Sequence, residues 1–324
     1  MKPRPSVFAL VLFCCGGLNA AQAQPIPKDS TKIQSNTKPI SSSSPNAWSD
    51  PFHRIGADIR AGNPLVVHVS VPLCSNAQIN CGAPWAGKPD GLNKNIYWGA
   101  VFGAKRFFDR KQSGWERVEL QNGPGEHLER VIYRRFISAS LWGLEASKRV
   151  EQLVVLQAIH GDQIDRAVLE FWKIATEGGT ISFREKDQER AVSIHVAGYA
   201  GHNRLMDGLK LPALSPEQSF RSAIPSFVMA CHSDSYFSAS LEKAGSAHLI
   251  ATRALMAPEG YIIDAITKAL GDNKSEKELR DETVRAYAKF QRISFQEAGA
   301  IFRPAKSART SSEFISAIQK IPKD

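Results

Sequence analysis

A histidine and a cysteine each follow a short apolar stretch of this sequence. His202 comes soon after residues 191–199, and Cys231 comes directly after residues 224–230. Both stretches have the apolar, β-rich character of buried strands. If the two predicted strands are parallel neighbours, both side chains emerge at the same edge of the sheet, which is where open α/β sheets bind ligands. A thiol and an imidazole placed in this way can form a nucleophilic pair, in which the histidine favours the reactive thiolate.

Six apolar runs predict the strands that must position these residues. Turn residues bound the runs, and stretches with helical periodicity alternate with them. This alternation is typical of a parallel sheet, so we expect an α/β fold with a mostly parallel sheet of about six strands and helices on both faces. The predicted strands are residues 64–71, 128–137, 149–159, 191–199, 224–230 and 247–252.

Capping patterns predict helices in the C-terminal part of the chain. Ser275 precedes Glu278 by three residues, and Ser294 precedes Glu297 by the same spacing. At this spacing the serine and the glutamate can each cap the other's backbone N–H group. A further helix is expected over residues 95–108, where an asparagine can cap the first turn and apolar residues recur on one face.

Composition divides the chain into four parts. Residues 1–23 combine a basic start, an apolar run and a small-residue end, which is the pattern of a secretory signal peptide. Residues 24–50 are rich in Ser, Thr and Pro and poor in apolar residues, so we expect a flexible leader. Residues 51–272 are expected to form the α/β domain, and residues 273–324 a helical extension. The protein is therefore expected to be exported, either to the periplasm or as a secreted protein.

Charge and hydropathy limit the classes of partner. The chain has 41 Lys and Arg residues and 32 Asp and Glu residues, a formal net charge of +9 at pH 7. Its basic residues form no run interleaved with aromatic residues, so nucleic acid is not expected as a partner. No stretch after the signal peptide reaches about 20 apolar residues, so no integral membrane segment is expected after signal cleavage.

Three cysteines remain after the predicted signal peptide. Cys74 and Cys81 are close in sequence, so in an oxidising compartment they are natural disulfide partners, and Cys231 is expected to stay reduced. The pair belongs to a long loop, residues 72–94, which also holds Trp85. Since this loop leaves the end of the first predicted strand, it is either a wall of the candidate site or a structural flap.

The two strand ends also resemble a known family. Gly201-His202 after one apolar strand and Ala230-Cys231 after the next resemble the caspase, gingipain and legumain group of cysteine peptidases, whose catalytic His and Cys end neighbouring strands. The resemblance implies a caspase-like sheet, a polypeptide substrate and no cofactor. It implies an exported cysteine endopeptidase in which Cys231 is the nucleophile and His202 protonates the leaving amine.

Such a mechanism assigns supporting roles to other residues. The backbone N–H groups of Asn203 and Cys231 are the candidate donors to the oxyanion. Asp207 and Asp234 are candidate contacts for a basic side chain of the substrate. Trp85, on the loop above the predicted strand ends, is a third candidate contact.

Three alternatives remain open from the sequence. His160, followed by glycine, ends another predicted strand and is a second candidate base. Asn203 stands where the family usually has glycine, and this departure favours a non-catalytic exported binding or scaffold protein with a degenerate peptidase fold. A zinc site is the third alternative, although its ligands would lack the short paired spacing of such sites. Those ligands would be His195, His202, Cys231 and His232.

Overall fold

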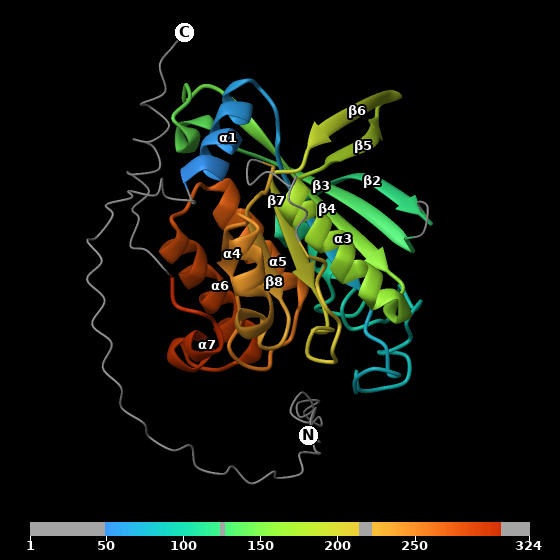
Figure 1. Cartoon of the computed structure of the whole chain (residues 1–324). Helices are drawn as coiled ribbons and strands as arrows, with labels where there is room; N and C mark the ends of the chain where they lie inside the picture. Colours follow the sequence, from blue (N-terminus) through green and yellow to red (C-terminus); the bar gives the residue numbers. More distant parts are fainter. Residues whose placement is uncertain (1–48, 124–126, 214–221, 306–324) are drawn as a thin grey trace, which may run out of the picture. The chain divides into compact units, whose positions relative to one another are not determined.

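Seven strands form the main sheet of the computed structural model, which describes residues 49–123, 127–213 and 222–305 (Figure 1). The strand order is β2-β3-β4-β1-β7-β8-β9. The predicted signal peptide, nearly all of the predicted leader and the end of the predicted extension lie outside the described residues. The strands are β1 (Leu65–Pro72), β2 (Glu116–Asn122), β3 (Glu129–Ser138), β4 (Arg149–Ile159), β7 (Val196–Ala200), β8 (Ser226–Met229) and β9 (His248–Ile250).

The sheet is mostly parallel, as predicted. Strand β1 pairs in parallel with β4 on one side and with β7 on the other, and the parallel pairing continues from β7 to β8 and from β8 to β9. Only β3 runs against its neighbours β2 and β4 among the strands of this sheet in the described residues. The extra strand relative to the prediction is β2, which forms between the helix predicted over residues 95–108 and the strand predicted over residues 128–137. Its charged residues are compatible with a sheet edge, since Glu119 pairs there with Arg130 of β3 at 3.1 Å.

The strand predicted over residues 191–199 is interrupted. Strands β5 (Thr180–Glu185) and β6 (Gln188–Ser193) form a separate antiparallel hairpin, and the chain joins the main sheet only at β7. His195 lies at the break, where its Nδ1 accepts the Val66 N–H at 3.0 Å and its Nε2 lies 3.1 Å from the Asp58 carboxylate. The buried imidazole of His195 therefore occupies the break between β6 and β7, where it contacts both β1 and α1 (Ser49–Arg60).

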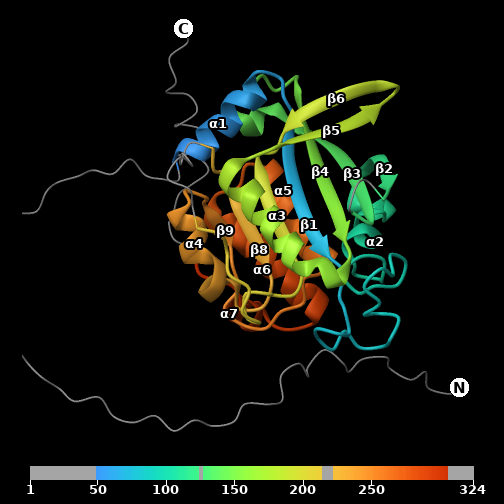
Figure 2. The same cartoon turned by 45° about the vertical axis from the view of Figure 1, so that its right-hand side comes forward.

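Helices cover both faces of the sheet, as predicted (Figure 2). On one face α3 (Ile164–Glu177) and α4 (Ala239–Lys243) pack on β7 and β8 through a core that includes Phe171, Tyr199 and Phe237. Side chains at alternate positions of β1 enter the larger core on the other face, because successive residues of a strand point to opposite sides. The helices that contribute to that core are α1 (Ser49–Arg60), α2 (Ala104–Phe108), α5 (Gly260–Gly271), α6 (Glu276–Gln291) and α7 (Phe295–Ile301).

The helix predicted over residues 95–108 is mostly wrong, because only α2 at its end is helical. Asn95 caps no helix. Its side chain instead accepts the Cys74 N–H at 3.0 Å and donates to the Cys74 carbonyl at 2.8 Å. Gly99 then passes so close to the backbone of Leu92 that a Cβ atom there would lie 2.0 Å from the Leu92 carbonyl oxygen. The segment is therefore a packed series of turns.

Both predicted capping boxes are confirmed. Ser275 and Glu278 cap each other at the start of α6, and Ser294 and Glu297 do so at the start of α7. These helices share their core with α5. Among the described residues, no helix combines the length and the apolar character needed to cross a membrane.

Candidate functional site

The topology brings His202 and Cys231 to the same edge of the sheet. In the parallel pair of β7 and β8, Ala200 lies opposite Met229, and the Gly201 N–H donates to the Met229 carbonyl at 3.1 Å. His202 and Cys231 each follow two residues after this last pair. They therefore begin two neighbouring loops at the carboxyl ends of the strands, which is the part of an open α/β sheet where ligands bind.

An aspartate orients the His202 ring. The Nε2 atom of His202 lies 2.6 Å from Oδ2 of Asp207, and the His202 side chain is only 12% exposed. The main chain of His202 is also fixed, since its carbonyl accepts a hydrogen bond from the Tyr199 hydroxyl at 2.8 Å. With Asp207 as acceptor, Nε2 carries the proton and Nδ1 is the ring nitrogen left for acid–base chemistry.

The Cys231 thiol is partly buried and lies against the main chain of Met256. The Met256 N–H donates toward the Cys231 sulfur at 3.5 Å, and the Met256 carbonyl lies 3.7 Å from the same sulfur. The Tyr287 hydroxyl accepts the next amide, that of Ala257, at 3.4 Å. Burial raises the pKa of Tyr287, and the neighbouring Glu259 and Cys231 add to that rise. Of these groups, the Met256 N–H is the backbone donor directed at the Cys231 sulfur, the atom that would carry the thiolate charge.

Asn203 joins the two loops. Its Nδ2 donates to the Cys231 carbonyl at 2.6 Å, and its Oδ1 accepts the Leu205 N–H at 3.1 Å. The side chain is fully buried. An asparagine at this position therefore has a structural function that a glycine could not perform.

The turn after Cys231 is tightly constrained. His232 adopts a left-handed backbone conformation with φ of 51°, and its N–H donates to the Ala254 carbonyl at 3.1 Å. The Ser233 hydroxyl donates to the Val228 carbonyl at 2.9 Å and accepts the Thr252 N–H at 2.9 Å. Left-handed conformations of residues other than glycine are uncommon and concentrate where function requires an unusual geometry.

Asp234, a candidate contact for the substrate, has partners within the protein. It contacts Arg303 at 3.2 Å, Arg253 at 3.3 Å and the Ser238 hydroxyl at 2.8 Å. Although burial acts to raise its pKa, the hydrogen bond from Ser238 and the charge of Arg303 hold the pKa of Asp234 below its ordinary value. Its surroundings are those of an internal bridge between the turn after Cys231 and the segment after α7.

The predicted disulfide between Cys74 and Cys81 is present, with a Cα–Cα distance of 6.2 Å. The long loop that contains this disulfide, residues 72–94, is attached to the end of β4, because the Gly161 N–H donates to the Pro89 carbonyl at 2.8 Å. Trp85 is 55% exposed on this loop. The loop is therefore ordered and fastened on the β4 side of β1.

His160 is separated from Cys231 by the strand order. It ends β4, and β1 and β7 lie between β4 and β8, so three strand spacings of about 4.8 Å separate the two strands. Its Nδ1 accepts the Asp162 N–H at 3.3 Å at the start of a short 3₁₀ turn. The Asp162 carboxylate accepts the Ser75 hydroxyl at 2.8 Å.

The residues of the zinc alternative do not gather at one point. Within residues 49–123, 127–213 and 222–305, no group of three or more His, Cys, Asp or Glu side chains is arranged to hold a metal ion. His195 lies before β7 and contacts Asp58, whereas His202 lies after β7. The length of that strand therefore separates two of the four proposed ligands.

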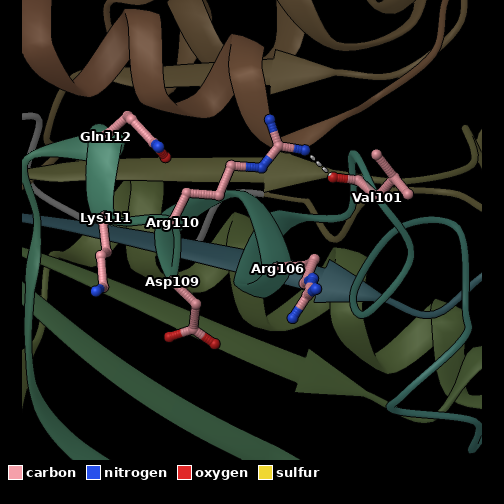
Figure 3. Close-up of a pocket in the computed structure, with 6 residues that line it drawn as sticks. All are labelled: Val101, Arg106, Asp109, Arg110, Lys111 and Gln112. Atoms are coloured by element: carbon pink, nitrogen blue, oxygen red, sulfur yellow. Dashed lines mark hydrogen bonds between the residues drawn. The ribbon is translucent and has the colours of Figure 1, made fainter.

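A depression of about 300 Å³ lies elsewhere, around α2 (Figure 3). Arg110 lines it and donates to the Val101 carbonyl, and burial together with the nearby Arg106 lowers the pKa of Arg110. Neither His202 nor Cys231 lines this depression. The residues that line the depression include no cysteine, no serine and no histidine.

Sequence reasoning missed three contacts of the site, the first being the bond from the Asn203 side chain to the Cys231 carbonyl. Asp207 was assigned to the substrate, although its position five residues after His202 could have suggested a loop that folds back on the ring. The approach of Met256 to Cys231 involves only the main chain of Met256, so no residue type could signal it.

No family model matches this chain, and neither the curated proteins nor the solved structures include a significant match to it.

Proposed function

We propose that this chain is an exported cysteine endopeptidase that hydrolyses peptide bonds with Cys231 and His202. The observation that carries the proposal is the parallel pairing of β7 and β8, after which a thiol and an Asp207-oriented imidazole follow at equivalent positions. Nucleophile, base and orienting group in this order are the arrangement that activates a thiol for attack on a carbonyl. The disulfide supports export, because disulfides persist in oxidising compartments.

In the first half of the reaction, the Cys231 thiolate attacks the carbonyl carbon of the scissile peptide bond and a C–S bond forms. His202 then donates its Nδ1 proton to the leaving amine as the C–N bond breaks, while Asp207 keeps the ring oriented through Nε2. In the second half, His202 takes a proton from water, which attacks the thioester and releases the acid product and the thiolate. The overall reaction is hydrolysis and consumes one water molecule.

The backbone N–H groups of Cys231 and Asn203 are the proposed donors to the oxyanion. The bond from the Asn203 side chain to the Cys231 carbonyl fixes the two amides relative to each other. Donors held in place before the reaction stabilise developing charge without a cost of reorganisation. The Met256 N–H has a separate role, since it is directed at the sulfur and favours the thiolate.

The proposal includes a resemblance to the caspase, gingipain and legumain group. Two features support it: Gly-His and Ala-Cys pairs follow neighbouring parallel strands, and helices cover both faces of the sheet that contains them. Asn203 in place of the usual glycine favours the second candidate, a non-catalytic exported binding or scaffold protein with a degenerate peptidase fold. The bond from the Asn203 side chain to the Cys231 carbonyl gives a different reason for an asparagine at this position, because it joins the two loops.

Cleavage of a mixed peptide library separates the two candidates. The chain without residues 1–23 is compared with its Cys231→Ala and His202→Ala variants, and products are identified by mass spectrometry. We expect cleavage by the parent chain, none by Cys231→Ala, and cleavage slowed by about 10²-fold or more in His202→Ala. A parent chain that leaves the whole library intact would favour the non-catalytic candidate.

A further inference from the structure

The segment that borders the Cys231 thiol presents an apolar side chain to solvent. Met256 directs its N–H and its carbonyl at the thiol, and the Ala254 carbonyl accepts the N–H of His232. Between these two contacts lies Leu255. The Met256 side chain is buried in the core, whereas Leu255 is 48% exposed. A large aliphatic side chain therefore stands free at the surface directly next to the residue that touches the nucleophile.

The two aspartates that could bind a basic side chain of a substrate, by contrast, already have partners within the protein. Asp207 is held by His202 at 2.6 Å and lies 3.5 Å from Arg204. Asp234 is held by Arg303 at 3.2 Å and by Arg253 at 3.3 Å. A charged side chain of a bound peptide would have to compete with these pairs, whereas an apolar side chain would remove further area of Leu255 from water.

We propose that Leu255 selects polypeptides with an apolar side chain next to the bond presented to Cys231. This inference rests on the proposed function. It replaces the expectation that Asp207 and Asp234 select a basic side chain of the substrate with the selection of an apolar side chain by Leu255. An enclosed hydrophobic pocket discriminates between side chains that differ by a methylene by about 10- to 200-fold, and a half-exposed leucine is expected to give the lower end of this range. Leu255 is thus a specificity-determining residue and takes no part in proton transfer.

Short peptidyl chloromethyl ketones test this preference without requiring cleavage. The Cys231 thiolate forms a C–S bond to the methylene carbon and chloride leaves, so the rate constant follows from the gain in intact mass. Probes with Leu, Phe, Arg or Asp next to the ketone are compared with iodoacetamide, which carries no side chain. We expect the Leu and Phe probes to react with the parent chain at least about tenfold faster than the Arg and Asp probes.

Leu255→Ala should reduce this preference several-fold and leave the iodoacetamide rate unchanged. Leu120→Ala is the matched control, because Leu120 is similarly exposed, at 41%, but lies on β2 at the opposite edge of the sheet. Equal rates for all four peptidyl probes, or a preference that survives Leu255→Ala, would overturn the inference. So would a thiol that none of the probes reaches in the folded protein.

The outcomes also separate this inference from the proposed function. Apolar preference in labelling, together with an intact peptide library, would leave the role of Leu255 standing and refute the endopeptidase. Cleavage of the library at bonds next to side chains of every kind would support the endopeptidase and refute the role of Leu255.

Discussion

The side chain of Asn203 donates a hydrogen bond to the main-chain oxygen of Cys231 at 2.6 Å, and so joins the loops that follow β7 and β8. Both loops carry a residue of the proposed dyad. The geometry of the dyad therefore depends on a buried amide whose two ends are both engaged.

Replacing Asn203 should destabilise the fold. In Asn203→Asp a carboxylate faces the Cys231 carbonyl without a proton to donate, and the free energy of unfolding should fall by about 1 to 3 kcal/mol, since a buried polar group loses its partner. Urea unfolding measures the change. Asn122→Asp is the control, because Asn122 is exposed at the end of β2 and should change stability by no more than about 0.5 kcal/mol. Equal stability of the two variants would show that the bond to Cys231 contributes little.

Asp207 is expected to position His202 rather than to bind substrate. Asp207→Asn keeps the side-chain volume but weakens the interaction with Nε2, so peptide cleavage should slow by less than the 10²- to 10⁴-fold that general acid–base catalysis is typically worth. The loss should fall on kcat more than on KM. Asp165→Asn, which removes the other carboxylate partner of Arg204, should leave both constants unchanged. A variant of Asp207 that affects only KM for basic peptides would restore the substrate role.

His68 should make the fold sensitive to mild acid. Burial in β1 lowers the pKa of His68 from 6.5 to about 4, despite its hydrogen bond to Gln157. Between these two pH values the unfolded chain binds the proton and the folded chain does not, so stability is lost as the pH falls. The shift corresponds to about 3 kcal/mol, present above pH 6.5 and lost by pH 4.

Urea unfolding between pH 7 and pH 4 measures this effect. The pH dependence of the parent chain should be steeper than that of His68→Gln, because acidic groups that titrate in the same range are common to both proteins. Parallel curves for the two proteins would show that His68 is protonated as easily in the folded state as in the unfolded state.

The disulfide should stabilise the fold without affecting the dyad. Replacing both Cys74 and Cys81 by serine should lower the free energy of unfolding by about 2 to 3 kcal/mol, because the cross-link restricts the unfolded chain. Peptide mapping without reduction should show the Cys74–Cys81 link in the parent chain. A rate of Cys231 alkylation that collapses in the double variant would instead make the loop part of the site.

The sheet could be predicted largely because its strands are buried. The run over residues 149–159 coincides with β4, since a continuous apolar stretch between turn residues has few other interpretations. Strand β2 escaped prediction because its charged residues resemble a loop until Arg130 and Arg134 of β3 are seen to pair with them. The helix expected after Asn95 failed because the Asn95 amide binds Cys74, a contact across the chain that local propensity does not encode.

The candidate site was predictable only as far as topology determines it. The two apolar runs predicted that His202 and Cys231 each follow a strand, and the condition that these strands are parallel neighbours is met by β7 and β8. The contacts of Asp207 and Asn203 depend on the path of a loop, and the contact of Met256 depends on a main chain 25 residues further along the sequence. Periodicity carries no information about such paths.

The alkylation rate of Cys231 as a function of pH tests the central proposal most directly. Iodoacetamide is added to the folded parent chain and to His202→Ala, and the gain in mass is followed from pH 5 to pH 10. The dyad predicts modification at one site, with a rate that stays high well below the pKa of about 8.5 of an ordinary thiol and that loses this low-pH reactivity in the variant. A thiol that reacts only as the protein unfolds, or a profile that His202→Ala leaves unchanged, would contradict it.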